Sequence, residues 1–424
     1  MRIAHFIQRY PPARGGSEAY FQRLSHFLHS QTDDVTVWTT IARDLAAFWS
    51  PKAECFPAGI SDDQGVSVRR YPLWRMRGRR WLLKPMSLIP LRAWQALTLP
   101  CNPISVRMWR DSGRAIDQFD AVHASACPYA WPIACAHRLA KRQGIPFLLT
   151  PFLHLGDPDD PHDASFKGYT QPALRRLLRA ADRVFAQTPR ERDAIIQLGV
   201  DSERVVLQGL GVDPAECTGG NRSQIRKAWQ VAENEVVIGH LANLSAEKGT
   251  IDLLLSAERC APCVVILAGP AMPRFESFWQ SHERRVRVLR LGELTDDQKR
   301  DFFAGIDVFA LPSRSDSFGL VLLEAWANRV PNVAYRAGGP GEIIHDGQDG
   351  LLAQCGNVDQ LSQQFNKLIH SRELRKTLGH AGNARVAVEF RWKDKLDLVR
   401  STVCQAIEDG RKMPTPSKLR VVRP

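Results

Sequence analysis

The sequence predicts an α/β protein with two Rossmann-like domains, whose parallel sheets face each other across a cleft. Its 424 residues exceed one ordinary domain and suit two domains of about 200 residues each. Short apolar runs alternate with helical patterns, which is typical of parallel sheets covered on both faces. Thirteen such runs are too many for one compact sheet. A stretch rich in Gly, Pro and small polar residues, 208–223, is therefore expected to separate two domains.

Seven expected strands precede this stretch and six follow it. Helices are expected between them, for example Ser17–His29 and Leu320–Asn328. Because ligands of open α/β sheets bind beyond the carboxyl ends of the strands, the cleft is the expected ligand site. The expected strands are Arg2–Ile7, Val35–Thr40, Val66–Tyr71, Ala121–Ser125, Pro146–Thr150, Arg183–Thr188, Arg204–Gln208, Glu235–Leu241, Cys263–Gly269, Val286–Leu291, Asp307–Leu311, Asn332–Tyr335 and Gly350–Ala353.

The expected division places an N-terminal domain at 1–210 and a C-terminal domain at 211–390. A last helix, at about 391–410, is expected to pack back on the N-terminal domain. The basic, Pro-containing tail 411–424 is expected to be mobile.

Composition narrows the class of protein. Hydrophobic residues make up 44% and charged residues 24%, as in a soluble globular protein. Lys and Arg exceed Asp and Glu by 57 − 45 = 12, which suggests an anionic partner or a solvated basic surface. Nine Cys without a paired framework favour a reducing compartment, and Cys260 and Cys263 are interpreted as structural. With no signal peptide or transmembrane run expected, a cytoplasmic location is predicted.

The most informative segment is Pro312–Ala327, where a Ser/Asp/Gly cluster follows a strand and opens an apolar helix. Free N–H groups and the positive dipole end of such a helix can hold a diphosphate. Asp316 and Glu324 are eight residues apart, and they share nearly one face if the helix begins early enough. One carboxylate can then bind sugar hydroxyls and the other a ribose diol. A capping Asp with a buried, hydrogen-bonded Glu is the structural alternative.

This segment resembles the signature of family-4 retaining glycosyltransferases, in which Ser-x-x-Glu-x-Phe-Gly leads to a closing Glu-Ala. The first acid is Asp316 here rather than Glu. The resemblance implies a GT-B fold, with Asp316 on the donor sugar and Glu324 on the ribose. The matching residues are Ser313, Asp316, Phe318, Gly319, Glu324 and Ala325.

Two further segments resemble the same family. Leu241–Gly249 is similar to its Gly-Arg-Leu-x-x-x-Lys-Gly segment, with Lys248 as the diphosphate-binding Lys and Asn243 where Arg is usual. A Lys at that place neutralises charge on the leaving phosphate. Ala337–Leu352 resembles a Gly-Gly block of the family, in which Glu342 receives no role.

In the N-terminal half, Gly15 and Gly16 follow the first strand, where the family has a loop near donor phosphate and acceptor. His154 follows another strand, and the resemblance implies that it contacts the donor sugar or the reacting centre. Asp157 and Asp159 form an Asp-x-Asp pair, but no metal site is expected there, because Lys248 and a helix dipole already supply positive charge.

The candidate catalytic residues are therefore His154, Lys248 and Asp316. No cofactor or metal is expected, and the substrate is a nucleotide-diphosphate sugar such as a UDP- or GDP-sugar. The candidate donor-binding residues are Gly15, Gly16, Asn243, Lys248, Asp316, Ser317, Phe318, Gly319, Leu320 and Glu324.

The segment 69–114 is strongly basic, and Asp111 is its only acid. Interleaved Trp and Arg suit an anionic membrane surface, although an acidic glycan, a nucleic acid or a solvated helical face would fit the same composition. We expect peripheral membrane contact here and no nucleic-acid partner, because no nucleic-acid-binding motif is present. The residues concerned are Trp74, Trp81, Trp94, Trp109, Arg69, Arg70, Arg75, Arg77, Arg79, Arg80, Lys84, Arg92, Arg107 and Arg110.

The resemblance predicts a retaining, metal-independent hexosyltransferase that acts on a glycan or lipid-linked acceptor in cell-surface polysaccharide or glycolipid synthesis. A non-catalytic nucleotide-sugar or glycan-binding relative is one alternative, and turnover of a donor would separate the two. A sugar-nucleotide epimerase on the same fold is another, because it would change the donor without an acceptor.

Overall fold

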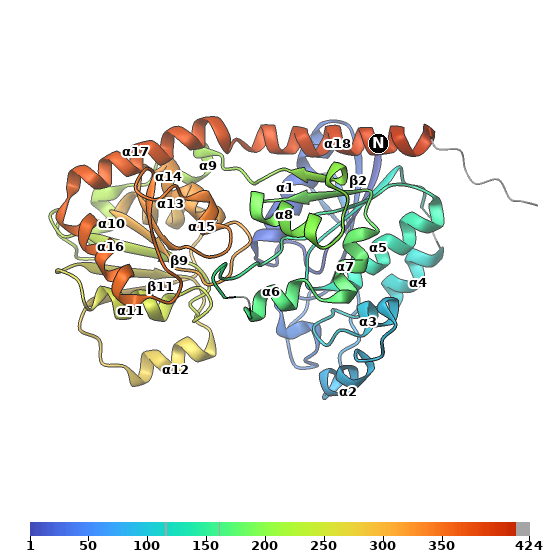
Figure 1. Ribbon diagram of the computed structural model, residues 1–424, viewed down its shortest axis with the longest axis horizontal. Helices are drawn as coiled ribbons and strands as arrows, with labels where there is room; N and C mark the ends of the chain where they lie inside the picture. The colour runs from blue at the N-terminus through green and yellow to red at the C-terminus, as the bar shows by residue number, and fades with distance from the viewer. Residues whose placement is uncertain (115–116, 161, 413–424) are drawn as a thin grey trace, which may run out of the picture.

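The chain forms two α/β domains side by side in a computed structural model that describes residues 1–114, 117–160 and 162–412 (Figure 1). Each domain contains one sheet, and both have parallel pairing as their main pattern. The predicted fold class is confirmed. All thirteen expected strands are present, with ends that differ by at most two residues.

The N-terminal sheet has the strand order β3-β4-β2-β1-β5-β6-β7-β8 among the described residues. All neighbours are parallel except β3, which pairs antiparallel with β4 at the edge. The sequence analysis missed β3 because its residues, GISDD, are polar and mostly exposed, so no apolar run marks the strand. The strands are β1 (Arg2–Phe6), β2 (Asp34–Thr40), β3 (Gly59–Asp63), β4 (Val66–Tyr71), β5 (Ala121–Ala124), β6 (Phe147–Leu149), β7 (Arg183–Ala186) and β8 (Val205–Leu207).

The C-terminal sheet is parallel throughout, with the order β11-β10-β9-β12-β13-β14. Its central strands are fully buried, as β10 shows with the sequence VVILA. Helices on both faces exclude water from such strands, which explains their continuous apolar character. The strands are β9 (Val237–Leu241), β10 (Val264–Ala268), β11 (Arg287–Gly292), β12 (Val308–Leu311), β13 (Asn332–Tyr335) and β14 (Gly350–Ala353).

Helices cover both faces of each sheet. Successive residues of β1 point to opposite faces, so Ile3 packs in the core beneath α1 and Ala4 in the core beneath α5. The helices are α1 (Gly16–Ser30), α2 (Arg79–Met86), α3 (Arg92–Thr98), α4 (Val106–Arg114), α5 (Ala130–Gln143), α6 (Ala164–Tyr169), α7 (Pro172–Arg179), α8 (Pro189–Gln197), α9 (Pro214–Cys217), α10 (Arg222–Ala228), α11 (Thr250–Ala257), α12 (Pro273–Ser281), α13 (Asp296–Gly305), α14 (Leu320–Ala327), α15 (Pro340–Ile343), α16 (Val358–His370), α17 (Arg372–Glu389) and α18 (Trp392–Lys412).

Two chain crossings connect the domains, and they lie against each other. The Val212 amide donates to the Phe390 carbonyl at 2.8 Å. A Cβ on Gly211 would lie 2.6 Å from the Trp392 nitrogen, so only Gly permits this approach. From the second crossing, α18 runs along the N-terminal domain (Figure 1), where Arg400 pairs with Asp33 at 2.9 Å. The remaining tail, 413–424, lies outside the described residues.

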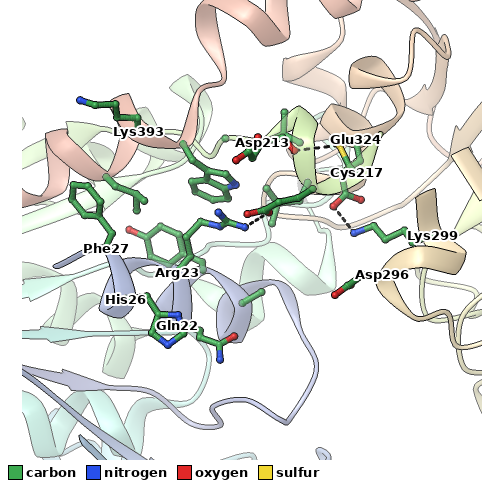
Figure 2. A pocket seen from close by; sticks show the side chains of 18 of the residues that line it. Gln22, Arg23, His26, Phe27, Asp213, Cys217, Asp296, Lys299, Glu324 and Lys393 are labelled. Atoms are coloured by element: carbon green, nitrogen blue, oxygen red, sulfur yellow. Dashed lines mark hydrogen bonds and ion pairs between the residues drawn. The ribbon is translucent and has the colours of Figure 1, made fainter. Parts of the chain in front are cut away.

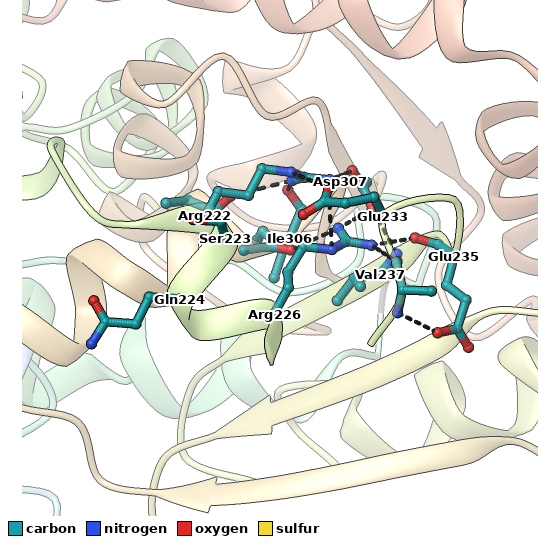
Figure 3. Close-up of polar contacts among 12 residues, drawn as sticks. Arg222, Ser223, Gln224, Arg226, Glu233, Glu235, Val237, Ile306 and Asp307 are labelled. Atoms are coloured by element: carbon teal, nitrogen blue, oxygen red, sulfur yellow. Dashed lines mark hydrogen bonds and ion pairs between the residues drawn. The ribbon is translucent and has the colours of Figure 1, made fainter. Parts of the chain in front are cut away.

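A buried ion pair anchors α10 to the amino ends of β9 and β12 (Figure 3). The Arg226 guanidinium, 1% exposed, lies 3.1 Å from Asp307 and donates to the carbonyls of Gly305 and Ala232. Asp307 also accepts from the Val237 amide. Because a buried charge without its partner is costly, this cluster is structural and keeps the opposite, carboxyl ends of the strands in place.

Candidate functional site

Two cavities lie between the domains at the carboxyl ends of the strands. The first, of about 450 Å³, is called the Lys248 cavity; Gly15, Gly16 and His154 line it from the N-terminal domain. The second, of about 740 Å³, is called the Glu324 cavity and lies between α1 and the C-terminal domain. Leu320, the first residue of α14, borders both. The start of α14 therefore separates the two cavities.

Lys248 and Asp316 form an ion pair in the first cavity. The loop after β9 carries Lys248 and the loop after β12 carries Asp316, and their charged atoms lie 2.6 Å apart. Burial alone would raise the pKa of Asp316, but Lys248 and His154 outweigh it and lower that pKa below its usual range. Asp316 is consequently an anion, and Lys248 is held with its charged end in the cavity.

The loop that contains Asp316 is shaped by a neighbouring Gly pair. The Gly339 amide donates to the Asp316 carbonyl at 2.8 Å. Gly338 has a φ of 53°, and a Cβ there would lie 2.4 Å from the same carbonyl. The pair therefore packs closely against the backbone of Asp316 and fixes the position of that residue.

Asp316 and Glu324 do not share a helical face. Gly319 is the N-cap of α14 and the helix begins at Leu320, so Asp316 lies in the loop before it. The shared face required a helix start before Asp316; the helix instead begins at Leu320, as the sequence predicted, and the cluster before it folds as a loop. The two carboxylates enter different cavities, one on each side of the start of α14.

Glu324 pairs with Lys299 in the second cavity, at 2.5 Å (Figure 2). Its second oxygen, Oε2, is buried and has no hydrogen-bond partner among the described residues. Burial raises the pKa of Glu324, and Lys299 only partly opposes that rise. Sequence reasoning missed Lys299. A capping box at Thr295 and Gln298 marks the start of α13, but nothing in the sequence indicates which way the helix faces.

The start of α1 faces the first cavity. Its N-cap, Gly15, has no side chain that could accept from the first amides of this fifteen-residue helix, so among the described residues these amides are available to a ligand. A Cβ on Gly15 would lie 2.1 Å from the Glu18 carboxylate, which Arg9 holds at 2.6 Å. At Gly16 nothing lies within 4 Å of such a Cβ. Gly15 is needed for internal packing, whereas Gly16 opens on free space.

His154 lines the same cavity on the loop after β6. Its ring stacks on Tyr169 with centroids 4.6 Å apart. Burial lowers the pKa of His154 to about 4, although Asp316 opposes this shift. The imidazole is therefore uncharged near neutral pH. Phe152, two residues earlier, has a φ of 50°, an unfavourable conformation for an aromatic residue, and it packs against Tyr20.

The remaining candidates differ in accessibility. Asn243, Ser317 and Gly319 line the Lys248 cavity. Phe318 borders it too, but is 2% exposed and packs in the core. Glu342, which received no role, accepts from the Thr188 hydroxyl at 2.9 Å across the domain boundary.

No group of three or more metal-ligating side chains occurs within the described ranges, Asp157 and Asp159 included. Cys260 and Cys263 are both free thiols. Within those ranges, no helix combines the length and apolar character needed to cross a membrane.

Comparison with known proteins gives consistent matches. Residues 221–385 match the family model for glycosyl transferases group 1, and residues 15–211 match that for the glycosyl transferase 4-like domain. The chain is 28% identical over 264 residues to D-inositol 3-phosphate glycosyltransferase of Mycobacteroides abscessus, covering 58% of each chain. It is 28% identical over 295 residues to the sulfoquinovosyl transferase SQD2 of Arabidopsis thaliana, covering 66% of this chain and 56% of the relative. The matched part is thus under two thirds of either relative.

Solved structures extend the likeness to nearly the whole chain. Anabaena HepE in complex with UDP aligns with a TM-score of 0.70 at 20% identity, covering 96% of this chain and all of that one. Sucrose-phosphate synthase of Thermosynechococcus elongatus aligns with a TM-score of 0.75 at 16% identity, covering 96% and 99%. At these identities the likeness concerns the fold, which is GT-B.

Proposed function

This chain belongs to the group 1 glycosyl transferases, and we propose that it moves a hexose from a nucleotide-diphosphate sugar to an acceptor, with retention of configuration and without a metal ion. One observation carries the proposal: two Lys–carboxylate pairs stand on either side of the start of α14, each lining a cavity between the domains. A diphosphate placed at this helix start would have a sugar on one side and a nucleoside on the other.

The donor would take its charge neutralisation from Lys248 and the free amides of the helix starts. Asp316 would accept hydroxyls of the sugar in the Lys248 cavity. Glu324 would accept ribose hydroxyls in the other cavity, where its Oε2 lacks a partner among the described residues. Relatives of the same fold support this class of donor, because Anabaena HepE was solved with UDP and with UDP-glucose.

Retention would follow if the acceptor hydroxyl attacks on the face from which the diphosphate leaves. The bond from the anomeric carbon to the phosphate oxygen breaks, the bond to the acceptor oxygen forms, and the acceptor proton passes to the leaving phosphate. The protein would then mainly position the reactants and stabilise charge. An uncharged His154 suits hydrogen bonding to a sugar hydroxyl, and Lys248 suits the phosphate.

A glycan or lipid-linked acceptor is proposed, as in synthesis of cell-surface polysaccharide or glycolipid, with a cytoplasmic location and peripheral contact with an anionic membrane. The charge excess of 12 and the basic segment 69–114 support such a contact.

The donor proposal is tested by thermal shift with UDP, GDP, ADP and their sugars, since a ligand of the folded state raises its stability. One nucleotide should stabilise the wild-type chain, and Glu324→Ala should lose most of that effect. An equal shift with every nucleotide, or none, would contradict the site. Hydrolysis or transfer of the matching sugar then separates an enzyme from a binding protein.

A further inference from the structure

An unusual apolar surface lies at one end of the N-terminal domain. Residues 74–94, called the α2–α3 tip, comprise α2, the start of α3 and their connections, and Figure 1 shows them at the end of the domain away from α18. Eight of the fourteen exposed large hydrophobic residues in the described chain fall in this tip. They are Trp74, Met76, Trp81, Leu82, Leu88, Ile89, Leu91 and Trp94, with Trp81 78%, Leu88 74% and Leu91 65% exposed.

Positive charge surrounds these apolar side chains. Arg77, Arg80, Lys84 and Arg92 are exposed, and none of them is in an ion pair with a described residue. No Asp or Glu occurs between positions 64 and 110. Arg80 and Lys84, one helical turn apart on α2, line an open hollow of about 440 Å³ together with Trp81. An apolar patch with unpaired cations and no acids is complementary to an anionic, partly apolar surface.

The structure also narrows the basic segment expected from the sequence. Arg69 pairs with Asp117 and lies over the Trp38 ring, so it is occupied within the domain. Arg79 is fully buried and donates to the Asn102 carbonyl at 2.6 Å. Arg79 and the buried Leu83 attach α2 to the domain and leave Trp81 outside. Part of the basic segment 69–114 is therefore core, and its exposed cations are concentrated in the tip and in α4.

We propose that the α2–α3 tip inserts into the interface of an anionic membrane. Trp81, Leu88 and Leu91 enter the boundary between headgroups and acyl chains, while Arg80 and Lys84 contact lipid phosphates. A protein partner or a second copy of the chain would cover the apolar residues, but would need acidic groups opposite the four cations. The proposal deepens the proposed function and rests on it only for the idea that the acceptor is lipid-linked.

The test is flotation of the full chain with vesicles of phosphatidylcholine, with and without phosphatidylglycerol. Wild-type protein should float with the anionic vesicles and bind neutral ones much more weakly. Trp81→Ser with Leu88→Ser, and separately Arg80→Glu with Lys84→Glu, should each lower the partition coefficient by at least about tenfold. Matched controls are Ile60→Ser, which is 72% exposed on β3, and Arg110→Glu with Arg142→Glu, both exposed outside the tip.

Equal flotation of the tip variants and the controls would overturn the proposal. The proposal would also be overturned if the control charge variant lost as much vesicle binding as the tip charge variant. That result would mean that net charge alone, and not its position in the tip, determines binding. Light scattering of the free chain addresses self-association: a wild-type dimer that Trp81→Ser with Leu88→Ser converts to a monomer would also overturn it. Thermal shift with UDP should be unchanged in every folded tip variant, so failure here is distinguishable from failure of the donor site.

Discussion

The two cavities hold the same kind of ion pair, yet the pairs behave differently. The carboxylates of Asp316 and Glu324 are equally accessible, at 17% exposure, and each meets a Lys. The pKa of Asp316 is nevertheless lowered and that of Glu324 raised. Burial raises the pKa of both acids, so the difference lies in how far the neighbouring groups offset that rise.

The neighbours of Asp316 favour its charged form, whereas Glu324 has two acids near it in addition to Lys299. His154 and the amide of Phe318 stabilise the Asp316 carboxylate beyond what Lys248 supplies. Glu324 lies near Asp296 and Glu216, and its Oε2 has no partner in the described part of the chain. The first pair is complete by itself, whereas the second has an acceptor that a ligand hydroxyl can satisfy.

The largest effect is expected from Lys248→Ala. This change removes the cation proposed to stabilise the leaving diphosphate and leaves Asp316 without its ion-pair partner, so kcat/KM for the donor should fall at least about tenfold, or 1.4 kcal/mol. Steady-state kinetics measures it, with Lys227→Ala, an exposed Lys on α10, as the matched control. Equal kinetics in the two variants would remove Lys248 from the donor site.

A second, smaller effect concerns pH and the Glu324 cavity. The pKa of Glu324 is raised and that of Asp316 is lowered, so the Glu324 carboxylate is protonated before that of Asp316 as pH falls. Nucleotide affinity should therefore decrease as pH falls past the pKa of Glu324. Lys299→Ala should move this decrease to higher pH, since the cation that opposes the rise is gone. Calorimetric titration of UDP or the matching nucleotide across pH measures both, and Glu324→Gln should abolish the acid-side dependence. If Lys299→Ala left the pH profile of nucleotide affinity unchanged, Lys299 would not control the pKa of Glu324.

A third comparison uses the adjacent glycines at the start of α1. Gly15→Ala places a methyl group against the Glu18 carboxylate, so it should lower the free energy of unfolding by about 1–2 kcal/mol. Gly16→Ala meets open space and should leave stability within about 0.5 kcal/mol, while weakening donor or acceptor use. Chemical denaturation and kinetics on the same pair give the two readouts. Equal stability losses would contradict this division of roles.

The fold was predictable from sequence because thirteen strands are apolar runs separated by helices of ordinary length. The edge strand β3 was not, since an exposed polar strand lacks that signal. Sequence patterns led to Lys248, Asp316, Glu324 and the start of α14 at Leu320, but not to Lys299. Lys299 meets Glu324 only through the packing of α13 beside α14, a tertiary contact 25 residues apart in sequence that leaves no local pattern.

The basic segment 69–114 also shows that local sequence does not reveal tertiary packing. Composition marked 69–114 as a basic segment with interleaved Trp, but it could not say which of its Arg side chains are exposed. The fold buries Arg79 and leaves Arg80 exposed, although the two are neighbours. Burial of a charged side chain depends on carbonyls such as that of Asn102, which come from elsewhere in the chain.

The smallest expected effect belongs to His154. Its pKa is lowered to about 4 in the folded state, so the folded protein binds fewer protons than the unfolded chain between that pKa and the ordinary value of about 6.5. The contribution of this residue to stability is therefore complete above pH 6.5 and is lost as pH falls toward 4. Replacement by Gln, which carries no proton, should make unfolding free energy less dependent on pH over that interval. Because the imidazole stays neutral between pH 6 and 8, the pH profile of wild-type activity should show no change due to His154 in that interval. An NMR titration that placed the His154 pKa near 6.5 would contradict this and would show that Asp316 offsets the effect of burial on that pKa.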